Sequence, residues 1–151
     1  MTAKGIQCGL KWGVAISLKN PQKSWLWHHP AINKVYDKAC ASDEPPNWFS
    51  FDFCAFGTPW KKSTTLMCWS LPDARQHLER RCCGRRGICG HSDRPHVVLE
   101  GRHKNGLPMT QVSEPYPAPL CKAYALCAQD FLWASKQHEI IRLCGDSTRR
   151  V

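Results

Sequence analysis

The sequence has no long apolar run and no apolar segment at its start. No stretch of about 18 apolar residues occurs among the 151 residues, so we expect no transmembrane helix and no membrane partner. The segment from Met1 to Leu10 lacks the continuous apolar core of a secretory signal. We therefore expect an intracellular protein, cytoplasmic or nuclear, whose ten cysteines are reduced thiols.

An internal repeat and a Cys-x-x-Cys pair are also missing. The length is enough for one compact core, so we expect a single main domain. Its expected organisation is a weakly ordered N-terminus at 1–13, a main body at 14–141 that contains a Cys/His-rich basic insertion at 71–113, and a basic tail at 142–151.

Acidic residues are scarce. The sequence has 12 Asp and Glu residues and 21 Lys and Arg residues, which gives a formal net charge of +9. Between Arg75 and Lys104 eight basic residues stand against three acidic ones, so more than half of the net charge lies there. This segment predicts either contact with the phosphates of a nucleic acid or a solvated basic loop.

Periodicity and turn signals predict an α/β fold. An apolar run around Trp48 to Cys54, a turn at Gly57 and a second β-prone run together predict a strand, a turn and a strand, with Lys61 and Lys62 at the turn. The expected elements are strands at 12–18, 48–54 and 63–70, helices at 30–40, 71–81 and 120–141, and a hairpin of 97–101 with 109–113. The first strand is expected to end at Asn20-Pro21, because proline cannot continue a central strand.

The stretch from Cys82 to His96 has almost no apolar residue with which to build a core. Its possible metal ligands are Cys82, Cys83, Cys89, His91 and His96. Zinc takes four nitrogen or sulfur ligands, and its binding free energy can order a chain that packing cannot order. The sequence predicts a zinc site made of Cys82, Cys89 and His96, with Cys54 or His91 as the fourth ligand.

The ligand spacing keeps two alternatives open. Cys82, Cys89 and His96 are seven positions apart in each step, more than the two to four of a usual zinc finger. Unligated surface thiols and a disulfide are therefore alternatives to zinc. Basic residues surround the same cysteines and the turn before them, and the candidate nucleic-acid contacts are Lys61, Lys62, Arg80, Arg81, Arg85, Arg86 and Arg94.

Three segments resemble the carboxyl half of cytosine-5 DNA methyltransferases, and more closely the divergent methyltransferase-like proteins of phages and mobile elements. Lys19-Asn20-Pro21 stands where that family has Glu-Asn at a strand end. The stretch from Phe53 to Lys62 is similar to the motif Tyr-Gly-x-Pro-Gln-x-Arg-x-Arg, and the stretch from Glu114 to Leu120 resembles the start of the closing helix. The resemblance implies a partial Rossmann-like sheet with a Cys/His-rich insertion and a long C-terminal helix.

The sequence lacks the motifs with which these methyltransferases carry out catalysis. A glycine-rich turn for S-adenosylmethionine and a Pro-Cys nucleophile are missing, and Lys19 replaces the glutamate that contacts cytosine. The family pattern thus implies a truncated domain associated with nucleic acid and inactive alone, in which Lys19 and Asn20 are positional relics and S-adenosylmethionine would need a missing N-terminal half. The alternatives are a zinc-ordered basic nucleic-acid-binding module, or the C-terminal part of a split enzyme whose partner chain completes the sheet beside 14–18.

Overall fold

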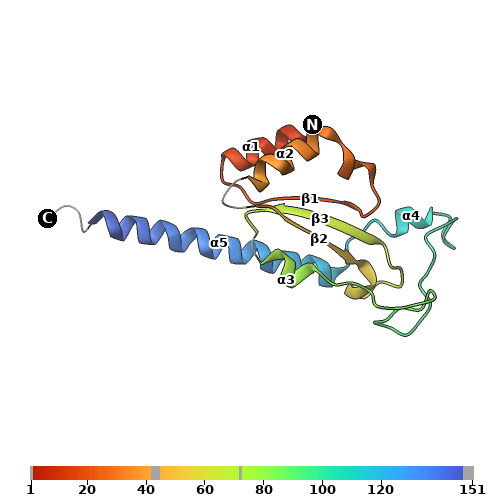
Figure 1. Ribbon diagram of the computed structural model, residues 1–151. Coiled ribbons are helices and arrows are strands. Elements are labelled where there is room, and N and C mark those ends of the chain that lie inside the picture. The colour runs from red at the N-terminus through yellow and green to blue at the C-terminus, as the bar shows by residue number, and fades with distance from the viewer. Residues whose placement is uncertain (1, 42–44, 72, 148–151) are drawn as a thin grey trace.

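A three-stranded antiparallel sheet lies at the centre of the protein (Figure 1). The computed structural model describes residues 2–41, 45–71 and 73–147. Strands β1 (Ile16–Pro21), β2 (Asn47–Asp52) and β3 (Ser63–Trp69) follow the order β1-β3-β2. The mixed α/β class is confirmed, and so is the pairing of the two strands on either side of Gly57.

The strand order differs from that of a Rossmann-like sheet. Strands β1 and β2 run in the same direction, as two strands joined by a helix often do, but β3 lies between them and pairs antiparallel with both. Both pairings of the described sheet are therefore antiparallel, whereas a Rossmann-like sheet is mostly parallel. A Rossmann-like fold is not confirmed.

Strand β1 begins and ends later than the sequence predicts. It starts at Ile16 and includes Asn20 and Pro21, which lie opposite Thr65 and Thr64 of β3. The expected break at Asn20-Pro21 was wrong because β1 is an edge strand, where a proline costs no hydrogen bond to a further strand.

Helices cover both faces of the sheet. On one face lie α1 (Thr2–Lys11), the short 3₁₀ helix η1 (Trp25–His28) and α2 (Pro30–Cys40), and on the other lie α3 (Ala74–Leu78) and the first part of α5 (Ala118–Ser147) (Figure 1). Side chains of β3 alternate between the two cores: Leu66 and Cys68 pack with the α3 and α5 side, while Met67 and Trp69 pack with the α1 and α2 side. The central strand is therefore buried on both faces.

The N-terminal segment 1–13, expected to be weakly ordered, contains helix α1. Glycines at 5 and 9 lower its helix propensity, but Ile6 is buried in the core that includes Ile32 and Val35 of α2. Tertiary packing thus outweighs local propensity in this segment. Helix α2 has the predicted bounds, with Pro30 at its first turn and the His29 side chain as its cap.

The remaining elements depart from expectation in length and type. Helix α3 is shorter than the predicted 71–81, and the predicted hairpin is reduced to one bridge between Arg102 and Pro108, followed by the short helix α4 (Met109–Val112). Helix α5 extends past residue 141, so the expected basic tail is helical to Ser147, and residues 148–151 lie outside the described residues. No helix in the described part of the chain has the length and apolar character needed to cross a membrane.

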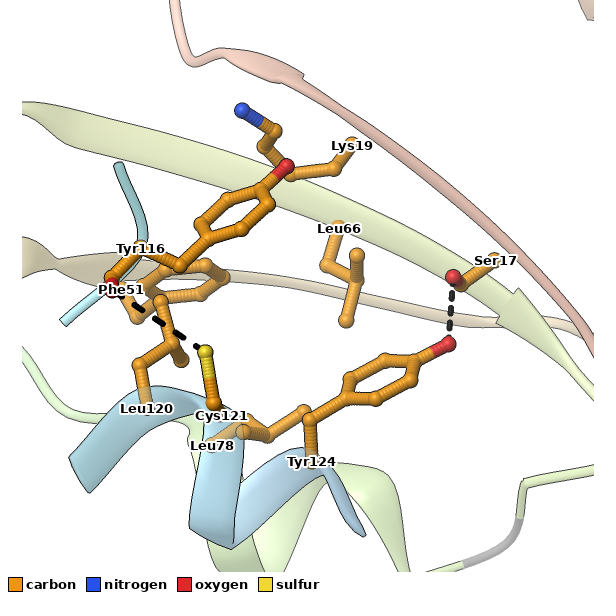
Figure 2. A pocket seen from close by; sticks show the side chains of 9 residues that line it. All are labelled: Ser17, Lys19, Phe51, Leu66, Leu78, Tyr116, Leu120, Cys121 and Tyr124. Atoms are coloured by element: carbon orange, nitrogen blue, oxygen red, sulfur yellow. Dashed lines mark hydrogen bonds between the residues drawn. The ribbon is translucent and has the colours of Figure 1, made fainter. Parts of the chain in front are cut away.

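Helix α5 also contacts the edge strand. The hydroxyl groups of Ser17 on β1 and Tyr124 on α5 lie 2.5 Å apart, at one end of a pocket of about 330 Å³ between the sheet and the helix (Figure 2). The side chains of Lys19 and Tyr116 lie at the other end, where the lysine Nζ is 4.6 Å from the centre of the tyrosine ring.

Candidate metal centre

The first residue of the centre, Cys54, lies in a tight turn at the end of the sheet. The turn is the 3₁₀ helix η2 (Phe53–Phe56), which directly follows β2 and ends at Gly57 in the left-handed conformation, with φ of 90°. A glycine adopts this conformation without strain, so the chain can reverse here toward β3. The Cys54 side chain is buried, and it packs against Cys82 and Cys89.

The segment that carries the other candidate ligands is hydrogen-bonded to the end of β2. The backbone N–H of Asp52 donates to the carbonyl of Arg80 at 2.9 Å, and the backbone N–H of Cys82 donates to the Asp52 carboxylate at 2.8 Å. The carboxylate is fully buried and also accepts a hydrogen bond from Ser63 of β3. This double link places Cys82 beside the turn that holds Cys54.

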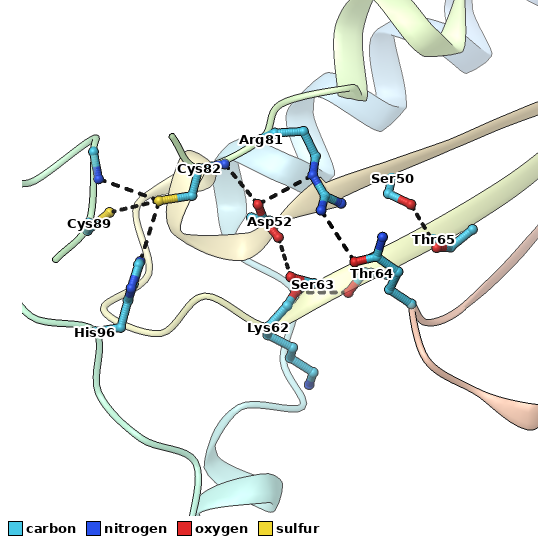
Figure 3. A network of polar contacts seen from close by, with 12 residues as sticks. Ser50, Asp52, Lys62, Ser63, Thr64, Thr65, Arg81, Cys82, Cys89 and His96 are labelled. Atoms are coloured by element: carbon cyan, nitrogen blue, oxygen red, sulfur yellow. Dashed lines mark hydrogen bonds and ion pairs between the residues drawn. The ribbon is translucent and has the colours of Figure 1, made fainter. Parts of the chain in front are cut away.

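Beyond Cys82 the chain doubles back on itself. Ile88 and Pro95 form a bridge, and the backbone N–H of His96 donates to the carbonyl of Gly87 at 2.8 Å. The backbone N–H of Cys89 donates to the carbonyl of Arg94 at 2.8 Å. These bonds hold Cys89 and His96 on the two sides of one narrow loop, so that both side chains turn toward Cys82 (Figure 3).

Two glycines allow this loop to close tightly. A Cβ atom at Gly84 would collide with the carbonyl oxygen of Ile88 and the backbone nitrogen of Gly90, and a Cβ atom at Gly90 would collide with the Cys83 sulfur. No larger residue fits at either position without moving the backbone. The loop is therefore built around two close backbone approaches.

Four ligand atoms converge at this place. One atom each from Cys54, Cys82, Cys89 and His96 lies within 4.8 Å of all the others. The sulfurs of Cys82 and Cys89 are 3.9 Å apart, and the Cys82 sulfur is 3.6 Å from Nε2 of His96. A tetrahedral zinc ion with its usual bond lengths requires sulfurs about 3.8 Å apart and a sulfur-to-nitrogen separation of about 3.6 Å. The group could therefore hold a metal ion of this kind.

The group agrees with the predicted ligand set, and it shows which of the two candidate fourth ligands joins the other three. Cys82, Cys89 and His96 come together as expected, and the fourth member is Cys54. His91 lies outside the group, is exposed, and contributes its backbone N–H to the Cys89 sulfur at 3.4 Å. Cys83 is exposed and also lies outside it. The cysteine side chains that the structure describes are free thiols.

The thiol groups of Cys89 and Cys54 differ in pKa. Burial would raise the pKa of Cys89, but hydrogen bonds from the His91 backbone and from Ser92 outweigh it and lower this pKa to about 6. Burial, together with hydrogen bonds to Cys82 and Cys89, raises the pKa of Cys54 to about 12. Since metal ligands must be deprotonated, an ion that binds here displaces the proton of Cys54.

The candidate nucleic-acid contacts divide into two groups. Three of them are already engaged: the Arg81 guanidinium lies 3.6 Å from the Asp52 carboxylate, Arg80 lies over the Phe56 ring, and the Lys62 ammonium donates to the Ser113 carbonyl at 2.5 Å. Burial, together with the nearby charge of Lys19, lowers the pKa of Lys62.

The second group is exposed. Arg85, Arg86 and Arg94 lie on the loop between Cys82 and His96, and their side chains make no ion pair within the described part of the chain. Lys61 is half-buried on the turn before β3. The sequence identified these residues as candidates. Which of the cations are engaged depends on the buried partners Phe56, Asp52 and Ser113, which lie 24, 29 and 51 positions away in the chain.

Sequence reasoning missed the pocket at Lys19 (Figure 2). Its walls come from β1, β2, β3, α3 and the start of α5, so residues far apart in the chain form it. No local motif marks Tyr116 or Tyr124 as partners of Ser17 and Lys19.

Three comparisons, with protein-family models, with curated proteins and with solved structures, find no match for the chain.

Proposed function

We propose that the chain is a basic nucleic-acid-binding module in which a zinc ion orders the loop from Cys82 to His96. One observation carries the proposal: the ligand atoms of Cys54, Cys82, Cys89 and His96 all lie within 4.8 Å of one another, and the distances from the Cys82 sulfur to Cys89 and His96 match those around a tetrahedral ion. The loop has no core of its own, and the metal supplies the free energy that packing cannot supply.

The ligand chemistry favours zinc and a structural role. Three thiolates and one imidazole form a soft sulfur and nitrogen set, which zinc accepts in tetrahedral geometry. All four positions are filled by protein side chains, so no position is left for a substrate or for an activated water. The centre therefore acts as a clamp between the turn after β2 and the loop.

The charge of the clamped loop favours a polyanion as the partner. Arg85, Arg86 and Arg94 are exposed on the loop, in a chain with a net charge of +9. A metal that fixes the loop also fixes these arginines relative to the sheet, which lowers the entropy that they lose on contact with phosphates. Lys62 and Arg81 have protein partners, so they contribute less.

Metal analysis tests the first half of the proposal. Protein purified from zinc-supplemented cells is expected to carry one zinc per chain. The double substitution Cys54→Ser with Cys89→Ser should abolish it, because two of the four ligands are gone. Cys121→Ser is the matched control, since Cys121 is an exposed thiol outside the group. Wild-type protein with less than about a tenth of an equivalent of zinc contradicts the proposal.

Salt-dependent binding tests the second half. Fluorescence anisotropy with a labelled oligonucleotide should show weaker binding as salt rises from about 50 to 200 mM. Replacing Arg85, Arg86 and Arg94 with glutamine should reduce the slope of log K against log salt by about three. The control replaces Lys4, Lys34 and Lys38 on the α1 and α2 side. A slope that is unchanged in the arginine variant contradicts phosphate contact by the loop.

A second candidate is the truncated methyltransferase-like domain. The observation that favours it is the meeting of its three resembling segments: Lys19 lies over the Tyr116 ring, whose centre is 6.2 Å from that of Phe53. Calorimetric titration of the chain with S-adenosylmethionine is expected to give no binding heat, because no glycine-rich turn holds the cofactor. Binding by the chain alone would contradict truncation. A split enzyme would further require a partner chain, which could pair with the edge strand β1.

A further inference from the structure

We propose that the nucleic acid bound at the metal-ordered loop is single-stranded, and that its unpaired bases lie against Ile88, Val97 and Val98. The inference rests on the proposed function and names the class of nucleic acid that this surface fits. Ile88, Val97 and Val98 are called the aliphatic face below.

The aliphatic face is exposed although its residues are apolar. Their exposed fractions are 41% for Ile88, 43% for Val97 and 66% for Val98. The backbone around them is fixed, since Ile88 bridges to Pro95 and the backbone N–H of Val97 donates to the carbonyl of Pro59 at 2.8 Å. An apolar surface on a fixed backbone, beside a metal centre, is a surface that a partner can cover.

Arginines lie near the aliphatic residues, both on the loop and directly before Val97 and Val98. Arg86 precedes Ile88 by two positions, and Arg94 precedes the bridge residue Pro95. In the register set by the bonds of Pro95 and His96, the next opposing positions are Arg86 and Val97. Cationic and apolar side chains therefore share one narrow loop, which suits a partner that presents phosphates and apolar faces at short intervals.

Single strands present both features. The faces of unpaired bases are apolar and open, whereas in a duplex they are covered by stacking and only the polar edges of the bases remain in the grooves. Proteins that bind single strands combine cations along the backbone with aromatic side chains on which the bases stack. The loop offers the cations, and the aliphatic face offers the bases apolar contact in place of aromatic stacking.

The loop offers no regular element for duplex recognition. Helix α3 ends at Leu78 and α4 begins at Met109, and between them the described chain has no helix and no strand beyond two isolated bridges. The major groove of DNA is read by an inserted helix or a two-stranded ribbon; the loop has no helix, and its two sides are joined by an isolated bridge rather than by paired strands. This further favours a flexible single strand that adapts to the loop.

The experiment compares one oligonucleotide in two forms. A fluorescein-labelled 20-nucleotide strand of mixed sequence and the duplex of that strand are titrated with zinc-loaded full-length protein at one salt concentration. We expect at least about tenfold tighter binding to the single strand. In the double variant Ile88→Ser with Val98→Ser, the affinity for the single strand should fall at least about fivefold and that for the duplex should stay unchanged. Zinc content verifies that the variant keeps the metal centre.

A matched control distinguishes the effect of the aliphatic face on affinity from the effect of losing exposed apolar surface in general. Val14→Ser with Leu132→Ser removes two exposed aliphatic side chains elsewhere, at 51% and 59% exposure, and should leave both affinities unchanged. Equal affinity for both forms, preference for the duplex, or an unaffected aliphatic-face variant overturns this inference and leaves nucleic-acid binding standing. Failure of the wild-type protein to bind either form overturns the proposed function as well.

Discussion

The Asp52 carboxylate accepts the backbone N–H of Cys82 at 2.8 Å, and this bond joins the sheet to the loop from Cys82 to His96. Asp52 ends β2, has no exposed surface, and also accepts from Ser63 while Arg81 lies 3.6 Å away (Figure 3). A buried carboxylate that receives backbone, hydroxyl and guanidinium groups is fully satisfied. The position of Cys82 is thus set by the buried end of β2.

Asp52→Asn should destabilise the protein. The amide has one acceptor in place of two and presents an N–H group to a buried donor, so we expect the free energy of unfolding to fall by about 2 to 3 kcal/mol. Urea denaturation followed by circular dichroism measures the change. Asp37→Asn on the exposed side of α2 is the control, with an expected change below about 0.5 kcal/mol. Equal stability of the two variants would show that Asp52 contributes nothing.

Metal removal should release the loop and spare the sheet. The two large cores contain none of the four ligands, so they persist when a chelator removes the ion. Brief trypsin treatment followed by mass spectrometry should then show cleavage after Arg85 and Arg86, while the zinc-loaded protein resists it. Cleavage after Lys34 and Lys38 in α2 serves as the internal reference. Identical cleavage patterns with and without chelator would contradict the clamp.

Gly84→Ala should disrupt the loop. The added methyl group meets the backbone of Ile88 and Gly90, which flexible side chains cannot relieve, so we expect lower zinc occupancy than in the wild-type protein. The matched control is Gly5→Ala in α1, where nothing lies within 4 Å of the new Cβ atom. That change should raise stability by up to about 1 kcal/mol through helix propensity. Full zinc occupancy in Gly84→Ala would show that the loop tolerates a side chain there.

Alkaline pH should destabilise the protein through Cys68. This side chain is fully buried in the sheet, and burial raises the pKa of Cys68 to about 12 from an ordinary value of 9.0. The unfolded chain releases the proton first, so the contribution is intact below pH 9 and is lost as the pH rises toward 12. Between pH 8 and pH 10 the loss due to Cys68 is on the order of 1 kcal/mol.

The test compares denaturant midpoints of wild-type protein and Cys68→Ala at the two pH values. Other thiols ionise in both proteins, so only the difference between the two pH dependences is assigned to Cys68. The variant should lose less stability on the change to pH 10, even though its absolute stability is lower because of the cavity left by the sulfur. Parallel pH dependences would contradict the assignment.

Local signals predicted the features that depend on few residues. The aromatic alternation before Cys54 and the turn at Gly57 predicted the β2 and β3 pair, and Pro30 marked the start of α2. The lack of apolar residues between Cys82 and His96 predicted a metal site there, and three members of the converging group, Cys82, Cys89 and His96, were named from it. Each of these inferences used residues that act within their own segment.

Features that depend on distant contacts were not predictable. Helix α1 forms because Ile6 reaches a core made by α2 and β3, and Pro21 is tolerated because no strand in the described part of the chain pairs with the outer edge of β1. The selection of Cys54 over His91 depends on the path of the loop, which is fixed by the bond from His96 to Gly87. The Lys62 ammonium donates a hydrogen bond to the Ser113 carbonyl, and no sequence pattern relates two residues so far apart.

The β1-β3-β2 order has a consequence for how the chain folds during synthesis. The first strand made has its partner only in the third, so β1 stays unpaired until Trp69 has left the ribosome. The hairpin of β2 and β3 can close as soon as it emerges, because its contacts are local, and it then serves as the template onto which β1 adds. Of the three described strands, we therefore expect β1, which is translated first, to join the sheet last.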